Sequence, residues 1–192
     1  MDNHNDFIAG VDEAGRGPLA GPVVAAAVIL HPAHTIVGLA DSKLLSEKTR
    51  EKLFAEIIAN AIAYSIGSAS VDEIEDINIL QASLLAMRRA VSGLSVAPSE
   101  IWVDGNQDPK CPFKTKLIIQ GDRSESLISA ASILAKVTRD RLMQKLDRQY
   151  PGYGLAKHKG YGTKEHLAAL KRLGPSECHR KGFAPIKIMC EA

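Results

Sequence analysis

Two adjacent carboxylates, Asp12 and Glu13, follow a short apolar segment at residues 7–11. The segment is expected to form a buried strand, because it is short, apolar and preceded by polar residues. Two carboxylates at the end of such a strand are costly unless a cation neutralises them. Their hard oxygen atoms suit Mg²⁺ or Mn²⁺. The pair therefore predicts a site for divalent metal ions.

Two further acids lie at boundaries between predicted elements. Asp104 ends a predicted strand at residues 101–104, and Asp122 opens a predicted helix over about residues 124–149. Ligands of open α/β sheets bind at the carboxyl ends of strands, so we expect both acids to converge on the first pair. Carboxylates that close raise one another's pKa. Two metal ions roughly 3.5–4 Å apart would neutralise them and stabilise the attacking and leaving oxygens of a phosphodiester displacement.

Simpler roles are also open for three of these acids. Asp122 is well placed as a helix N-cap. Asp104 precedes the turn sequence Gly105-Asn106, and a role in that turn would explain it. Glu13 faces a geometric objection, because neighbouring side chains of a strand point to opposite faces of the sheet. We therefore expect the main chain to leave regular strand geometry at Glu13, which the nearby Gly15 would permit.

A glycine-flanked arginine follows the acid pair, at Gly15, Arg16 and Gly17. Because glycine has no Cβ atom, the main chain of this segment can approach a phosphate or a sugar closely. A strand, a pair of carboxylates and then a glycine-flanked cation is the layout expected of a metal-dependent phosphodiester site.

The elements that must position these residues follow from apolar periodicity and cap signals. Ser46 and Thr163 are expected to cap helices, and Ser70 with Glu73 forms a capping box. A second such signal at Asn78 predicts a short helix followed by a longer one that ends near residue 92. The predicted strands cover residues 7–12, 22–30, 62–69, 101–104 and 116–119, and the clearest helices cover about 47–60, 124–149 and 163–173.

This order of elements predicts an α/β fold with a mixed sheet of about five strands flanked by helices, and a helical C-terminal part. Three antiparallel strands would be extended by parallel ones. The length suits a single domain over residues 1–192. Residues 182–192 carry no pattern that predicts a role.

Composition narrows the class of protein. With 45% apolar and 24% charged residues, the chain is expected to be soluble and globular. Three cysteines without paired spacing argue against a disulfide framework or a zinc site. The polar N-terminus does not resemble a signal peptide, and no apolar run is long enough for a membrane span. We expect a cytoplasmic monomer with no membrane partner.

The charge distribution is uneven along the chain. Residues 1–100 carry 7 Lys and Arg against 13 Asp and Glu, whereas residues 101–192 carry 17 against 9. Such asymmetry favours a polyanionic partner such as nucleic acid. Lys136, Arg139 and Arg141 are expected to form a solvated or ion-paired helix face rather than part of a site.

Five segments together resemble the bacterial ribonuclease HII family. The segments are Gly10–Val23, Asp41–Ser46, Val103–Gly105, Gly121–Asp140 and His158–Thr163, in the order of the family. The resemblance implies the ribonuclease H-like fold. It also implies cleavage of RNA strands paired with DNA and incision 5′ to single ribonucleotides embedded in duplex DNA. The products would carry 5′-phosphate and 3′-hydroxyl ends.

The resemblance also implies roles for individual residues. Asp12, Glu13, Asp104 and Asp122 match the family's catalytic acids, which hold two Mg²⁺ or Mn²⁺ ions. Gly15, Arg16 and Gly17 match the segment that contacts the ribonucleotide and the adjoining phosphate, and Tyr161 matches the tyrosine that packs against the sugar on the DNA side of the junction. Ser42 and Lys43, before a helix N-terminus, are expected phosphate contacts.

Alternatives to this assignment remain. Ribonuclease HIII and junction resolvases are other nucleases of the same fold class, although ribonuclease HIII is expected to carry an extra N-terminal domain. A hybrid-binding protein without catalytic activity is the alternative from another class. Tyr161 is also explained as an exposed loop aromatic, and the flanking His158 and His166 are expected to pack or cap rather than to bind zinc.

Overall fold

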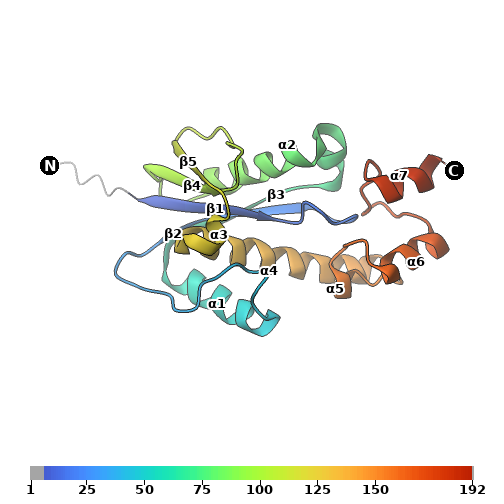
Figure 1. Cartoon of the computed structure of the whole chain (residues 1–192), viewed down its shortest axis with the longest axis horizontal. Coiled ribbons are helices and arrows are strands. Elements are labelled where there is room, and N and C mark those ends of the chain that lie inside the picture. The colour runs from blue at the N-terminus through green and yellow to red at the C-terminus, as the bar shows by residue number, and fades with distance from the viewer. Residues whose placement is uncertain (1–6, 192) are drawn as a thin grey trace.

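A five-stranded mixed sheet lies at the centre of the computed structural model, which describes residues 7–191 (Figure 1). The strand order is β3-β2-β1-β4-β5. Neighbours among the first three strands are antiparallel, and β4 and β5 extend the sheet in parallel, as predicted. The strands are β1 (Ile8–Ala14), β2 (Val23–Leu30), β3 (Ala61–Ala69), β4 (Glu100–Asp104) and β5 (Lys114–Ile118).

Helices cover both faces of the sheet. The helix α2 packs on one face, and α1 and α4 pack on the other (Figure 1). No helix within residues 7–191 has the length and apolarity needed to cross a membrane. The helices are α1 (Glu47–Asn60), α2 (Val71–Ser92), α3 (Gly121–Ser124), α4 (Ser126–Gln149), α5 (Leu155–His158), α6 (Lys164–Leu173) and α7 (Ala184–Glu191). The predicted single domain over residues 1–192 stays a prediction.

The predicted helix starts agree with the structure. Ser46, Ser70 and Thr163 each accept a hydrogen bond from a main-chain N–H in the first turn of their helix. Asn78 has a φ of 65° inside α2, and its side chain accepts from the N–H groups of Leu80 and Gln81. The capping signal at Asn78 therefore does begin a second helical stretch, as predicted, but across a kink rather than a loop.

Between residues 114 and 126 the structure differs from the prediction. The strand expected at residues 116–119 begins earlier, at Lys114. The helix expected over about 124–149 begins two residues later, as α4 at Ser126, because Glu125 is extended and separates α3 from α4. The simpler N-cap role that was open for Asp122 is excluded, since Asp122 lies inside the first turn of α3 and Gln120 occupies the cap position. The segment without a predicted role contains α7.

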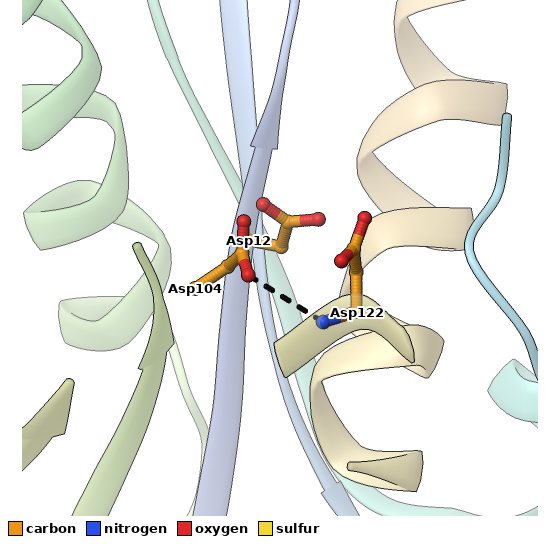
Figure 2. Close-up of side chains that lie close together, drawn as sticks. All are labelled: Asp12, Asp104 and Asp122. Atoms are coloured by element: carbon orange, nitrogen blue, oxygen red, sulfur yellow. Dashed lines mark hydrogen bonds between the residues drawn. The ribbon is translucent and has the colours of Figure 1, made fainter. Parts of the chain in front are cut away.

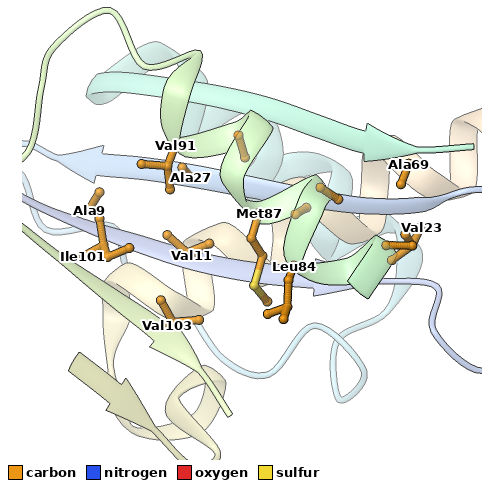
Figure 3. Close-up of a cluster of buried hydrophobic side chains, with 14 of the residues drawn as sticks. Ala9, Val11, Val23, Ala27, Ala69, Leu84, Met87, Val91, Ile101 and Val103 are labelled. Carbon is orange, nitrogen blue, oxygen red and sulfur yellow. The ribbon is translucent and has the colours of Figure 1, made fainter. Parts of the chain in front are cut away.

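The core contains small side chains where the helices approach the sheet. Alanines of β2 alternate between the two faces. On the α2 face, Val11 and Val103 pack in one cluster with Met87 of α2 (Figure 3). On the other face, a Cβ at Gly10 would lie 2.2 Å from the main-chain carbonyl of Leu127. The start of α4 therefore meets β1 with no side chain between them, which brings the α3–α4 region against the strand that carries Asp12.

Candidate active site

Three acids converge where β1, β4 and α3 meet (Figure 2). Asp12 comes from β1, Asp104 ends β4, and Asp122 lies in the first turn of α3. Each offers one carboxylate oxygen, and these oxygens lie within 4.8 Å of one another. The main-chain N–H of Asp122 also donates to Asp104 Oδ1 at 3.4 Å. The predicted convergence at the carboxyl ends of the strands is confirmed for these three.

The electrostatics of this group favour a cation. Burial, with the nearby carboxylates of Glu13 and Asp104, raises the pKa of Asp12 well above its ordinary value. Burial and Asp104 likewise raise the pKa of Asp122. Lys43 Nζ approaches Asp122 Oδ2 at 3.8 Å, but one ammonium cannot balance three carboxylates. A divalent ion would remove the remaining repulsion.

The chemistry of the donors fits magnesium or manganese. All three candidate ligands are carboxylates, the hard oxygen donors these ions prefer. Asp12 and Asp122 are buried, so an ion bound there would have little competition from bulk water. The residues present are therefore suited to the divalent ions expected from the sequence.

Glu13 lies differently from the prediction. The strand β1 continues regularly through Glu13 to Ala14, with Glu13 opposite Ala25 of β2. The expected break in strand geometry is wrong, and the Glu13 side chain faces α2, where it lies 3.4 Å from Arg16 Nη1. Burial raises the pKa of Glu13, Arg16 opposes that shift, and Asp104 adds to it. Glu13 thus lies at the edge of the acidic group rather than within its closest set.

A pocket of about 260 Å³ opens beside the acids and unites the six predicted substrate contacts. Tyr161 is 47% exposed at its rim. A Cβ at Gly17 would lie 3.6 Å from the Tyr161 ring, so the glycine loop and the tyrosine face each other. The predicted contacts in the lining are Gly15, Arg16, Gly17, Ser42, Lys43 and Tyr161.

The turn before α1 joins the pocket to the acids. Asp41 Oδ1 accepts from the main-chain N–H of Lys43 at 2.9 Å, and Asp41 Oδ2 accepts from Arg123 at 3.3 Å. The Lys43 ammonium remains largely exposed, between the pocket and Asp122. Ser42 is buried and hydrogen-bonded to Ser132 Oγ at 2.8 Å. Lys43 therefore extends its ammonium group at the pocket, whereas the Ser42 side chain is held in the turn by its bond to Ser132.

One basic residue of α4 is placed differently from the prediction. Lys136 and Arg141 form ion pairs with Asp140 and Glu51, as expected, although Lys136 also lines the pocket. Arg139 is 1% exposed and lines the pocket, so its expected place on a solvated or ion-paired face is wrong. Arg139 follows the buried residues Ile128, Ser132 and Ala135 at helical spacing. That spacing was the signal for its burial.

The histidines near Tyr161 are structural, as predicted. His158 Nε2 lies 2.8 Å from the carbonyl of Tyr153, and the His158 and His166 rings stack with centroids 4.4 Å apart. His166 also contacts His179, which no sequence pattern indicated as part of the site. His166 and His179 both belong to a buried group next to the pocket.

Comparison with known proteins agrees with this geometry. The family model described as Ribonuclease HII matches residues 9–186. A Ribonuclease HII from Burkholderia mallei is 59% identical over 187 residues, covering 97% of this chain and 87% of that relative. The ribonuclease H2 of Pyrococcus horikoshii OT3 superposes with a TM-score of 0.80 at 29% identity, covering 96% of this chain and 97% of that one. Bst-RNase HIII in complex with Mn²⁺ shares the fold, with a TM-score of 0.75 at 17% identity and coverage of 96% and 69%. With a family model and a close relative matching nearly its whole length, this chain belongs to the ribonuclease HII family of ribonuclease H endonucleases.

Proposed function

We propose that this endonuclease cleaves the RNA strand of RNA–DNA hybrids and incises duplex DNA 5′ to embedded ribonucleotides. The observation that carries the proposal is the group of Asp12, Asp104 and Asp122 beside a pocket lined by the glycine loop and Tyr161. An acidic metal site cuts a phosphodiester, and a pocket next to it selects the nucleotide to be cut.

The proposed cofactors are two divalent ions, Mn²⁺ or Mg²⁺. Asp12, Asp104 and Asp122 would hold them, with Glu13 contributing from the opposite face of β1. The carboxylate donor set and the complex of Bst-RNase HIII with Mn²⁺ support this assignment. When bound, such ions would supply an activated water molecule and stabilisation of the leaving 3′-oxygen, and the products would carry 5′-phosphate and 3′-hydroxyl ends.

The pocket residues would recognise the ribonucleotide. A single 2′-hydroxyl distinguishes it from its neighbours, so donors and acceptors must approach that hydroxyl closely. The main chain of Gly15 and Gly17 permits this approach, and Tyr161 offers a flat apolar surface to the next sugar. Lys43, whose ammonium group is largely exposed, would contact the adjoining phosphate.

Cleavage of a defined duplex tests the proposal. The protein is incubated with end-labelled DNA that carries one ribonucleotide, in Mn²⁺, in Mg²⁺ or with chelator, and the cut is mapped. Incision 5′ to the ribonucleotide that chelator abolishes supports the proposal. Cleavage only within runs of several ribonucleotides would contradict the junction specificity. Tight binding without any product would favour a binding protein.

A matched pair of variants tests the acids. Asp104→Asn should abolish cleavage, whereas Asp108→Asn should not, because Asp108 lies outside the group and pairs with Lys110.

We further propose that the protein acts as a monomer in the cytoplasm. A monomer is supported because one chain supplies all the acids and all the pocket residues. Light scattering at the monomer mass of 20.7 kDa would test it.

A further inference from the structure

The segment Ser176–Arg180 lies directly behind the glycine loop, although no sequence motif selected it. Ala20 and His179 form an isolated antiparallel bridge. The N–H of Gly21 donates to Cys178 O at 2.8 Å, and the N–H of Arg180 donates to Leu19 O at 2.8 Å. The loop that follows β1 is therefore held by main-chain contacts with a segment about 160 residues later in the chain.

Arg180 fixes the loop through its side chain. It is fully buried, and its guanidinium donates to Gly15 O at 2.6 Å, to Arg16 O at 2.9 Å and twice to Gly21 O. All acceptors are main-chain carbonyls, and within residues 7–191 no carboxylate forms an ion pair with this guanidinium. Four charge-assisted bonds to neutral acceptors therefore hold the guanidinium of Arg180 beneath the loop.

The direction of these carbonyls determines where the loop amides point. In a trans peptide the N–H lies opposite the C=O, and residues 7–191 contain no cis peptide. Because Gly15 O and Arg16 O point inward to Arg180, the N–H groups of Arg16 and Gly17 point outward. Both residues are exposed, and neither N–H donates to a protein acceptor in the described part of the chain. Consecutive free amides of this kind bind anions.

His179 acts on the other side of the pocket through His166. His166 Nδ1 lies 2.9 Å from Tyr161 O, which can only accept, so the proton of a neutral His166 is on Nδ1. His166 Nε2 then accepts from His179 Nε2 at 3.1 Å. His179 Nδ1 is left to accept from the N–H and hydroxyl of Ser176, at 3.0 and 2.8 Å. Burial lowers the pKa of both rings, that of His179 to about 4, which agrees with neutral tautomers.

We propose that His179 and Arg180 are positioning residues of the substrate pocket. Arg180 turns the amides of Arg16 and Gly17 toward the substrate, and His179 fixes the main chain at Tyr161 through His166. Two adjacent residues thereby hold the two sides of the pocket at a set distance. The inference rests on the proposed function, in which this pocket receives the ribonucleotide and its phosphate.

Two substitutions of His179 separate positioning from simple packing. His179→Gln keeps an N–H donor near the place of Nε2 and can still bond to His166. His179→Asn keeps a polar atom near the place of Nδ1, toward Ser176, but loses the link to His166. We expect the first to bind a fluorescent duplex with one ribonucleotide as the wild type does, and the second to bind about tenfold more weakly. Equal weakening in both variants would overturn the role of His179.

Arg180→Lys tests the other side. A lysine cannot replace four divergent N–H bonds, so we expect KM for the duplex to rise about tenfold while kcat falls less than threefold. Mn²⁺ binding measured by calorimetry should not change, because Arg180 does not contact the acids. Arg172→Lys is the control, since Arg172 donates to a main-chain carbonyl at an exposed site. An unchanged KM with only a lower Tm would assign Arg180 to stability alone and overturn its role.

Binding and cleavage are measured separately, so that failure of the positioning role and failure of the proposed function give different results. Duplex binding is measured by anisotropy in Ca²⁺, and cleavage separately in Mn²⁺. If the wild type binds but does not cut, the proposed function fails, while the affinity differences among the variants still support positioning. If the wild type cuts 5′ to the ribonucleotide and His179→Asn and Arg180→Lys bind it equally well, the inference fails and the proposed function stands.

Discussion

Asp12→Asn is expected to abolish cleavage and, at the same time, to stabilise the metal-free protein. Asp12 is buried among like charges, and its pKa is raised by burial and by the carboxylates of Glu13 and Asp104. Asparagine keeps the local contact, because its Oδ1 can accept from the N–H of Glu13 as Asp12 Oδ1 does at 2.7 Å. The substitution therefore removes a charge with little loss of hydrogen bonding.

The size of the effect follows from the geometry. The oxygens of Asp12, Asp104 and Asp122 lie within 4.8 Å of one another, and at an effective dielectric constant of about 20 each such pair of charges costs about 3.5 kcal/mol. Partial protonation and the ammonium of Lys43 already relieve part of this repulsion. We expect a net gain of about 2 kcal/mol in the free energy of unfolding, or about 4–8 °C in Tm for a chain of this length.

The assay is thermal unfolding at pH 7.5 with chelator and then with Mn²⁺. Mn²⁺ at about 100 times its Kd should stabilise the wild type by about 2.7 kcal/mol and the variant far less, so the order of stability reverses. Asp41→Asn is the matched control. Burial opposes ionisation of Asp41, but the Lys43 N–H and Arg123 outweigh it and lower its pKa, so this substitution should destabilise. If both variants lose stability without metal, the acids are not in repulsion and the argument for a metal site fails.

Three further outcomes are expected. Gly15→Ala should lower the free energy of unfolding, measured by denaturant titration, by about 2–4 kcal/mol and should remove duplex binding, because Gly15 has a φ of +99° and a Cβ there would lie 2.0 Å from Arg139 Nε. Gly17→Ala has room for its Cβ and should unfold like the wild type in the same titration. Between pH 6.5 and pH 4, His179 should lower the free energy of unfolding by about 3 kcal/mol, because its pKa is near 6.5 in the unfolded chain and about 4 in the folded protein. If the free energy of unfolding of His179→Gln depended on pH as that of the wild type does, this assignment would be contradicted. Glu13→Gln should keep the tightest Mn²⁺ binding event in calorimetry, and Asp12→Asn should lose it, since Glu13 lies outside the closest group; loss of that event in both variants would place Glu13 among the primary ligands.

Local signals predicted the elements that carry the site. Ser46, Ser70, Asn78 and Thr163 are short polar side chains placed directly before apolar periodic segments, and each does begin a helical stretch. The convergence of the acids also followed from general rules, because strand ends in an α/β sheet share one edge. These predictions needed only neighbours in the sequence and the known behaviour of sheets.

The helical spacing of Arg139 indicated its burial, but the acceptors that hold Arg139 and Arg180 could not be predicted in the same way. A buried arginine is unusual, and what permits it here is a set of carbonyls from residues 15–22 and 159 that fold around each guanidinium. Those acceptors are main-chain atoms, so no residue type marks them in the sequence. The prediction for the main chain at Glu13 was wrong for a different reason. A break in the strand was inferred from chemical need, whereas the β1–β2 ladder kept it regular.

The contact between Gly10 and the carbonyl of Leu127 has a consequence for how the acidic site tolerates change. Asp12 lies two residues after Gly10, and Asp122 lies five residues before Leu127, so a contact between two main chains sets the spacing of their carboxylates. Bond lengths and van der Waals radii of the peptide unit do not depend on sequence. The hydrophobic core on the α2 side can therefore be repacked, in a relative or by design, while the distance between Asp12 and Asp122 stays the same. The spacing of these two acids and the composition of that core are, in this fold, separately adjustable.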